Sequence, residues 1–371
     1  MGKKFSALIL LVMCVICAAA FAKFGNETGV FRKPPEANYL SDTEEASRPA
    51  YQQLSKQEQA IYEALYRGIT EKKEFIPLPY EIDGDTYSRV YCMLEKQEGR
   101  FIYLGSSYYT AEKLREAQIV YRDGLEEADR KKEAVERAEK KALENIKSHT
   151  SEYGKVMAIN DYIVNNCTYV SGEDGDYSPT IYGCLVEKEA NCEGYAKTFD
   201  MLASDVGVES CLITGVTDKG ENHAWNQVKV DGKWYNLDVT WGDTDEGDDI
   251  RRAYFLCTDE DFAGTHKADE RIFTPMICTA VEDNYYVRNG LFVETEADAK
   301  RIIGDSVNRG SKMIEMKFAN DDIYKSFKQK YIKDQKIFDV LTEYGMQFIG
   351  DMTVSIKDGD GDRCITLLLK D

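Results

Sequence analysis

A strong hairpin signal at Asp231-Gly232 constrains the fold more than any other feature of this sequence. An Asp-Gly pair suits a two-residue type I′ turn, because both central positions of that turn need positive φ. The turn sets the pairing of the flanking strands, and side chains alternate between faces, so His223 and Asp238 become diagonal neighbours on one face. Their Cα atoms are then about 7–8 Å apart, within reach of the two side chains. The opposite face is apolar and is predicted to be buried. It comprises Val228, Val230, Tyr235, Leu237, Val239 and Trp241.

Scarce residue types gather in the same stretch. The chain has only three histidines and three tryptophans, and all three tryptophans lie with His223 in the segment 223–241. An aspartate beside a histidine fixes the tautomer of the ring and supports the imidazolium, which is the orienting role in a catalytic triad. An arbitrary His–Asp pair on a sheet is more often structural, so the catalytic interpretation depends on a nucleophile. The other histidines are predicted to be solvated (His149) and structural (His266).

Cys192 has the sequence surroundings of a reactive thiol. Asn191 is a good N-cap, Glu193 places an acid in the first turn, and the segment 192–205 has a helical pattern. At a helix N-terminus the macrodipole and the free N–H groups favour the thiolate. The backbone N–H of Cys192 is also a natural donor to an oxyanion. These features predict that Cys192 is the missing nucleophile.

Three motifs in the chain order Cys, His, Asp make a family resemblance specific. They are NCEGYA at 191–196, NHAWN at 222–226 and YNLDVTW at 235–241. Together they resemble the bacterial transglutaminase-like superfamily, which has a papain-like thiol fold, over roughly residues 150–285. The resemblance implies that Cys192 is the nucleophile, His223 the general base that becomes the general acid, and Asp238 the residue that orients His223.

The resemblance also implies a reaction class. A thiol of this family attacks an amide, forms a thioester acyl-enzyme and releases the acyl group to water or to an amine. We therefore expect a protein or peptide substrate, from the cell wall or the extracellular space, and either peptidase/amidase or acyltransferase activity. The alternative is an inactive scaffold or binding protein at the cell surface. No cofactor or metal is expected, because thiol acyl transfer needs none and no CxxC spacing occurs beyond the N-terminal leader.

The N-terminus predicts export. Lys3 and Lys4 precede an apolar run from Ala7 to Ala20, and the sequence AFA at 20–22 supplies a cleavage signature. The run is shorter than the roughly 20 residues that cross a bilayer, so an uncleaved membrane anchor is the weaker alternative. Eight of the ten cysteines lie beyond this leader. They allow up to four disulfides or a reserved thiol, and the sequence does not fix the connectivity.

Composition excludes some classes of function. With 43% hydrophobic and 30% charged residues the chain is globular, and its net charge of −19 argues against nucleic-acid binding, which depends on clustered Lys and Arg. The fold class predicted is α+β. The chain is predicted to divide into a signal peptide (1–22), a flexible spacer (23–54), an N-terminal α/β domain (55–148), a transglutaminase-like catalytic core (149–285) and a small C-terminal α+β domain (286–371). The oligomeric state cannot be predicted.

Periodicity predicts most of the remaining elements. Helices are predicted at 56–69, 126–146, 152–165 and 323–344. Strands are predicted at 75–81, 87–94, 101–104 and 312–318, followed by a final pair at 346–356 and 364–369. A hairpin around Asn289-Gly290 is predicted for 285–293.

Overall fold

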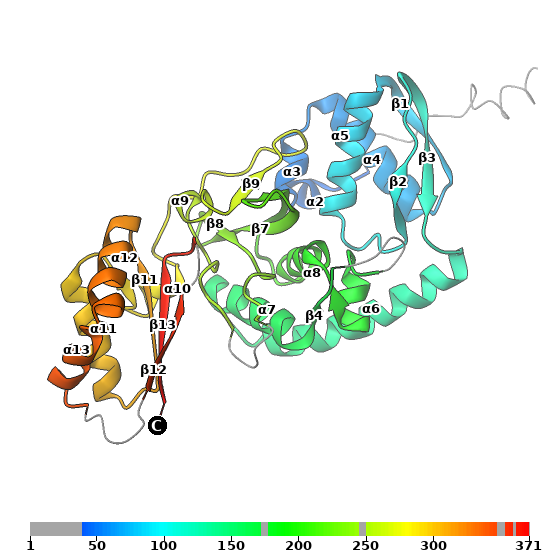
Figure 1. Cartoon of the computed structure of the whole chain (residues 1–371). Coiled ribbons are helices and arrows are strands. Elements are labelled where there is room, and N and C mark those ends of the chain that lie inside the picture. The colour runs from blue at the N-terminus through cyan, green and yellow to red at the C-terminus, as the bar shows by residue number, and fades with distance from the viewer. Residues whose placement is uncertain (1–38, 172–176, 245–249, 347–352, 359–360, 371) are drawn as a thin grey trace, which may run out of the picture. The chain divides into compact units, whose positions relative to one another are not determined.

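The structure is a computed structural model that describes residues 39–171, 177–244, 250–346, 353–358 and 361–370. The chain divides into two compact units, Met1–Arg130 and Lys131–Asp371. Helices and strands are mixed in both units, as expected for an α+β chain (Figure 1). The predicted leader and residues 23–38 of the predicted spacer lie outside the described residues. No helix among the residues described has both the length and the apolar character needed to cross a bilayer.

The first unit contains a three-stranded antiparallel sheet in the order β1-β3-β2. Its strands are β1 (Phe75–Asp83), β2 (Leu104–Tyr108) and β3 (Lys113–Tyr121). Its helices are α2 (Asp42–Ala46), α3 (Pro49–Gln52), α4 (Lys56–Thr70) and α5 (Gly84–Gln97). The predicted helix at 56–69 is confirmed as α4, which begins with a capping box between Ser55 and Glu58. A Cβ at Gly68 would collide with the side chain of Ile76, so this glycine permits the close approach of α4 and β1.

The strand predicted at 87–94 is wrong, because these residues lie in α5. The carboxylate of Asp83 accepts the backbone N–H of Thr86 at 2.8 Å, so Asp83-Gly84 begins a helix instead of closing a hairpin. Helical spacing brings four side chains of this helix into the core: Tyr87, Val90, Tyr91 and Leu94. Their aromatic and β-branched character favours a strand locally, and the packing of one helix face overrides that preference.

Two further predictions for this unit need correction. Residues 39–54, predicted as part of a flexible spacer, contain α2 and α3. Tyr51 in this segment is buried and donates its hydroxyl to Glu63 of α4 at 2.7 Å, a contact that no periodic pattern announces. The strand predicted at 101–104 begins only at Leu104, whose N–H closes a turn onto the carbonyl of Phe101 at 2.9 Å.

The second unit is built around a four-stranded antiparallel sheet in the order β8-β7-β6-β9. Its strands are β6 (Ser210–Thr217), β7 (Asn222–Val230), β8 (Lys233–Leu237) and β9 (His266–Ala268). The helical elements near it in sequence are α6 (Leu125–Ile146, which spans the division between the units), α7 (Glu152–Asn166), the π-helical turn η1 (Gly183–Glu187), α8 (Cys192–Asp205) and α9 (Asp259–Phe262). A short parallel pair, β4 (Thr168–Tyr169) and β5 (Glu189–Ala190), precedes α8. The helices predicted at 126–146 and 152–165 are confirmed as α6 and α7.

The predicted hairpin is confirmed with its register. Asp231 and Gly232 both have positive φ, at 48° and 81°, as a type I′ turn requires. The pairing runs from Val230 with Lys233 to Asn226 with Leu237. The turn therefore sets which residues of β7 and β8 share a face, and this register brings the end of β8 toward the start of β7.

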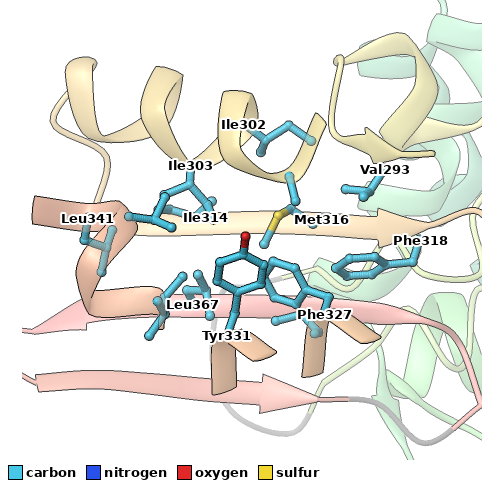
Figure 2. Packing of buried hydrophobic residues seen from close by; sticks show 14 of the residues in the cluster. Val293, Ile302, Ile303, Ile314, Met316, Phe318, Phe327, Tyr331, Leu341 and Leu367 are labelled. Atoms are coloured by element: carbon cyan, nitrogen blue, oxygen red, sulfur yellow. The ribbon is translucent and has the colours of Figure 1, made fainter. Parts of the chain in front are cut away.

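The rest of the second unit forms a small α+β subdomain. Its strands are β10 (Phe292–Val293), β11 (Met313–Phe318), β12 (Thr353–Asp358) and β13 (Cys364–Lys370), in the sheet order β10-β11-β13-β12. Its helical elements are α10 (Tyr285–Arg288), α11 (Glu296–Asn308), α12 (Asp321–Phe327), the π-helical turn η2 (Lys328–Lys333) and α13 (Ile337–Glu343). Figure 2 shows their shared core, in which Ile303, Met316, Phe318, Phe327 and Leu367 are buried together.

Two predictions for this subdomain are changed by the structure. Residues 285–293 form α10 followed by β10 and not a hairpin, because Asn284 caps the helix and Gly290, at φ 66°, ends it. The helix predicted at 323–344 is interrupted at Gln335, whose φ is 57°, and divides into α12, η2 and α13. The predicted strand at 312–318 is confirmed as β11, and the final strand pair is β12 and β13. Residues 347–352 of the predicted strand 346–356 lie outside the described residues.

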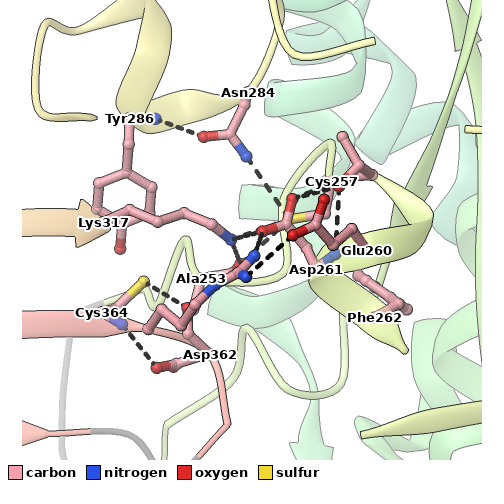
Figure 3. A network of polar contacts seen from close by, with 12 residues as sticks. Ala253, Cys257, Glu260, Asp261, Phe262, Asn284, Tyr286, Lys317, Asp362 and Cys364 are labelled. Atoms are coloured by element: carbon pink, nitrogen blue, oxygen red, sulfur yellow. Dashed lines mark hydrogen bonds and ion pairs between the residues drawn. The ribbon is translucent and has the colours of Figure 1, made fainter. Parts of the chain in front are cut away.

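A buried polar network links this subdomain to the segment that contains α9 (Figure 3). Lys317 of β11 is 1% exposed, and its Nζ lies 3.2 Å from Oδ1 of Asp261 and 3.0 Å from the carbonyl oxygen of Ala253. Arg363 donates to the same Asp261 oxygen at 2.6 Å. The neighbouring Asp362 forms an ion pair with Arg251. Charged contacts from the C-terminal sheet therefore hold α9 in place.

Lys317→Met is expected to lower the free energy of unfolding of the second unit by about 3 kcal/mol, because it leaves a buried carboxylate without one of its two cations. Urea denaturation followed by tryptophan fluorescence measures this loss, since all three tryptophans belong to the second unit. The matched control is Lys325→Met, whose ion pair with Asp321 is exposed to solvent and is expected to contribute little to stability. Equal losses in the two variants would contradict a structural role for the network.

Candidate active site

Cys192 is the first residue of α8, as predicted. The side-chain oxygen of Asn191 accepts the backbone N–H groups of Glu193 at 3.0 Å and Gly194 at 3.2 Å, which fixes where the helix begins. A Cβ at Gly194 would collide with the carbonyl oxygen of Ser178, so the glycine lets the first turn of α8 approach that segment closely. The cap therefore explains the Asn-Cys-Glu-Gly sequence, and it leaves the thiol of Cys192 half-buried.

The start of α8 lies against β6 and β7. Cys192 packs on a small buried cluster made of Ala196 of α8, Leu212 of β6 and Ala224 of β7. The amide of Asn226 on β7 donates to the carbonyl of Ala196 at 3.0 Å, which ties the strand to the helix. This packing fixes the start of α8 against β7, the strand that carries His223.

His223 and Asp238 are hydrogen-bonded. Nε2 of His223, near the start of β7, lies 2.7 Å from Oδ2 of Asp238, which follows the end of β8. The carboxylate is buried at 1% exposure and the histidine at 8%. The Cys192 thiol lies close enough to His223 to raise the pKa of the imidazole. The structure thus places the three residues predicted from the sequence within one group of contacts.

The electrostatics of the pair favour charge on both partners. Burial by itself lowers the pKa of His223, but the charge and hydrogen bond of Asp238, with a smaller effect of Cys192, raise this pKa to about 10. Burial likewise raises the pKa of Asp238, and the two nearby imidazoles, His223 foremost, outweigh it and hold this pKa well below its usual value. The pair is therefore an imidazolium–carboxylate ion pair at neutral pH.

His266 is a member of the group that sequence reasoning missed. It was predicted to be structural, whereas its Nε2 lies 3.1 Å from the same Oδ2 of Asp238 that His223 contacts. His266 begins β9, which pairs with β6 and not with β7 or β8. No local spacing connects it to Asp238, so only the order of strands in the sheet reveals the contact. His149, predicted to be solvated, is exposed.

Aromatic rings surround the His266 imidazole, which contacts the Asp238 carboxylate. The ring centroids of Trp241 and Phe262 lie 4.5 and 4.2 Å from that of His266, with Trp225 at 5.0 Å and Tyr254 at 5.5 Å. Such packing excludes water and strengthens the charged contacts within it.

The prediction that Trp241 lies on the face opposite His223 is wrong, since the two ring centroids are 5.3 Å apart. The regular pairing with β7 ends at Leu237, and Oδ1 of Asp238 then accepts the backbone N–H of Trp241 at 3.1 Å. This turn breaks the strand alternation on which the prediction depended.

Two tyrosines lie beside the thiol. Tyr169 of β4 pairs with Ala190, two residues before Cys192, and its ring lies 6.4 Å from that of Tyr195 on α8. Tyr169 is 44% exposed, so it presents an aromatic surface next to Cys192. The hydroxyl of Tyr195 donates to Asp243 at 2.5 Å. Asp243 begins the acidic segment 243–249 of the sequence, and residues 245–249 of that segment lie outside the described residues.

The ligand atoms of His223, Asp238 and His266 all lie within 4.8 Å of one another, a spacing that a metal ion can also use. No spacing of residues in the sequence predicts such a group. The two nitrogen–oxygen separations of 2.7 and 3.1 Å are hydrogen-bond distances, and all three side chains are buried. We therefore describe the group as hydrogen-bonded. The eight cysteines of the described chain are all free thiols.

Comparisons with known proteins define the class of this region. Residues 140–239 match the model of the transglutaminase-like superfamily. The chain therefore contains a transglutaminase-like domain within an α+β fold, as the three sequence motifs indicate.

Individual similarities are confined to part of the chain. Kyphoscoliosis peptidase of Mus musculus is 31% identical over 108 residues, which are 25% of this chain and 16% of that protein. The Homo sapiens protein of the same name is 31% identical over 111 residues, 26% of this chain and 16% of that protein. The chain thus spans about a sixth of the length of these curated relatives. A crystal structure of a TGase is similar with 21% identity, 36% coverage of this chain, 37% of that chain and a TM-score of 0.28.

Proposed function

We propose that this protein is a thiol enzyme that acts on amide bonds of a protein or peptide through an acyl-enzyme thioester at Cys192. The observation that carries the proposal is that His223 is hydrogen-bonded to Asp238 and lies close enough to Cys192 for the thiol to raise the pKa of the imidazole. The order is a half-buried thiol, an imidazole and a buried carboxylate. This order matches the nucleophile, the base and the orienting carboxylate of a catalytic triad.

The proposed first step is acylation. The imidazolium form of His223 supports the Cys192 thiolate, which attacks the carbonyl carbon of the substrate amide. The resulting oxyanion accepts the backbone N–H of Cys192, which is not one of the two N–H groups that Asn191 caps. When the C–N bond breaks, His223 gives its proton to the leaving nitrogen, and a thioester remains on Cys192.

The proposed second step releases the acyl group. His223, now neutral, takes a proton from water or from a primary amine, which attacks the thioester carbon. The C–S bond breaks and the thiolate forms again beside the imidazolium. Water as acceptor gives a hydrolase and an amine gives an acyltransferase. Incubation with a glutamine-containing protein and a fluorescent primary amine separates them, since only a transferase incorporates the amine.

Selective alkylation tests the proposal without knowledge of the substrate. At pH 7 iodoacetamide is expected to modify Cys192 first, because burial raises the pKa of several other thiols, among them Cys211, Cys257 and Cys364. Peptide mass spectrometry over time measures the order of modification. Cys92, which is also half-buried, is the matched comparison. Modification of Cys192 no faster than a cysteine of the denatured chain would favour the scaffold alternative.

The proposal also includes export and a division of the chain into domains. We propose that residues 1–22 are a signal peptide and that residues 149–285 are the catalytic core between two flanking domains. Expression of the full chain in a secreting host tests the first point, because cleavage after Ala22 predicts a mature N-terminus at Lys23.

A further inference from the structure

A single carboxylate oxygen of Asp238 lies within hydrogen-bond distance of two imidazoles. Oδ2 lies 2.7 Å from Nε2 of His223 and 3.1 Å from Nε2 of His266, while Oδ1 accepts the N–H of Trp241. The two histidines come from strands on opposite sides of β6, since His223 belongs to β7 and His266 to β9. Both rings therefore reach across the sheet to the same carboxylate. A triad needs only one of these contacts.

The glycine between the two strands makes this crossing possible. Gly215 of β6 pairs with His223 on one side and Ala268 on the other. A Cβ at this position would lie 2.1 Å from the carbonyl oxygen of Lys267 in β9 and 2.8 Å from the Trp225 ring, which itself contacts His266. Any larger residue would therefore displace β9, which carries His266, from its place beside β6.

The protons of the group can be assigned from its acceptors. An ionised Asp238 only accepts, so Nε2 of each histidine must carry a proton. The hydroxyl of Thr265 lies 2.9 Å from Nδ1 of His266 and 3.3 Å from the carbonyl of Phe262. If the hydroxyl donates to Nδ1, His266 is neutral with its proton on Nε2. If it donates to the carbonyl, both ring nitrogens are protonated. His266 donates to Asp238 in either case.

We propose that His266 is a positioning residue for the reaction at Cys192: its N–H donates to Asp238, fixes the orientation of that carboxylate toward His223 and shares its negative charge. This inference rests on the proposed function. Without His266 the carboxylate keeps His223 and the Trp241 N–H but gains rotational freedom. Its whole charge then acts on one imidazole, so His223 becomes a weaker acid for protonating the leaving nitrogen.

Other titratable groups around the carboxylate come from three further segments. They are Cys192 of α8, Tyr169 of β4 and Tyr254, whose ring faces His266. Tyr169 and Tyr254 are neutral at pH 7, because burial raises the pKa of each. Neither phenol therefore contributes a charge at this pH. His266 is the partner of Asp238 whose removal changes the hydrogen bonds of the carboxylate without removing a residue of the proposed triad.

Two substitutions separate positioning from packing. His266→Phe fills the aromatic site without a donor, whereas His266→Gln keeps an N–H near the position of Nε2. We expect kcat to fall by about 10–100-fold in His266→Phe with KM nearly unchanged, as for other residues that orient a reacting group indirectly. His266→Gln is expected to recover most of the rate. His149→Phe is the matched control, since His149 is exposed.

Proton NMR provides a readout that packing alone does not move. With three histidines in the chain, the full-length protein at pH 7 is expected to show two downfield imidazole N–H resonances, from His223 and His266. His266→Phe removes one of them and moves the other further downfield, because His223 then holds a larger share of the carboxylate, whereas His266→Gln removes one and leaves the other nearly in place. If the rate falls in both variants and the His223 resonance does not move in His266→Phe, His266 acts through packing alone and the inference is overturned.

The two proposals fail in different ways. If wild-type Cys192 shows no selective alkylation, the proposed function fails, and the NMR signature still tests the shared carboxylate. If Cys192 is selectively alkylated but His266→Phe keeps the wild-type rate and His223 resonance, only the inference about His266 is overturned. If His266→Phe does not fold, His266→Gln decides: a rate near that of the wild type supports the inference, and a loss of rate with an unmoved His223 resonance overturns it.

Discussion

Asp238→Asn is expected to lower kcat by about 10³–10⁴-fold while leaving the fold and Cys192 in place. The asparagine has the shape of the aspartate but no negative charge, so it neither supports the His223 imidazolium nor fixes which ring nitrogen carries the proton. The measurement is the rate of acyl transfer or hydrolysis, with KM determined separately. Because the carboxylate makes no substrate contact in the proposed mechanism, KM should change little.

A second variant controls for loss of structure at position 238. Asp283→Asn also removes a buried carboxylate, one that accepts the hydroxyl of Tyr235 at 3.1 Å and forms an ion pair with Arg288. It is expected to destabilise the second unit without a comparable loss of kcat. If both substitutions reduce kcat equally, Asp238 has no special part in the reaction and the triad assignment is wrong.

The stability of the second unit is expected to fall as the pH rises from about 6.5 to about 10. Folding raises the pKa of His223 to about 10, above its unfolded value of about 6.5, so the ion pair with Asp238 contributes fully below pH 6.5 and is lost above pH 10. The pKa of Asp238 is lowered by folding, so its contribution is present above about pH 4 and declines in acid. Each unit of pKa corresponds to about 1.4 kcal/mol, which makes the total change a few kcal/mol.

Urea denaturation of the wild-type and Asp238→Asn proteins at a series of pH values measures this contribution. The difference in unfolding free energy between the two should be largest near pH 5–6 and should shrink toward pH 10. Other groups titrate in both proteins and cancel in the difference. A difference that is constant across this range would show that His223 and Asp238 do not form an ion pair in the folded protein.

Local signals predicted the parts of the site whose causes lie within a few residues. The Asn191 cap placed Cys192 at the start of α8, and the Asp231-Gly232 turn fixed the register of β7 and β8. The turn placed His223 beside Asp238, and the family resemblance of the three motifs added Cys192 to that pair. Local reasoning failed for residues 87–94, where Asp83 caps α5 and Tyr87, Val90, Tyr91 and Leu94 are buried at helical spacing.

The amino-acid sequence by itself thus determined the class of the domain and the three residues proposed for its chemistry. Only the tertiary structure decided that His266 shares the carboxylate of Asp238 and that Trp241 lies on the same side as His223. The physical reason is the distance along the sequence between the residues that interact. A cap or a tight turn is specified by neighbouring residues, whereas the order β8-β7-β6-β9 depends on the packing of strands distant in sequence, and that order brings His266 to the site.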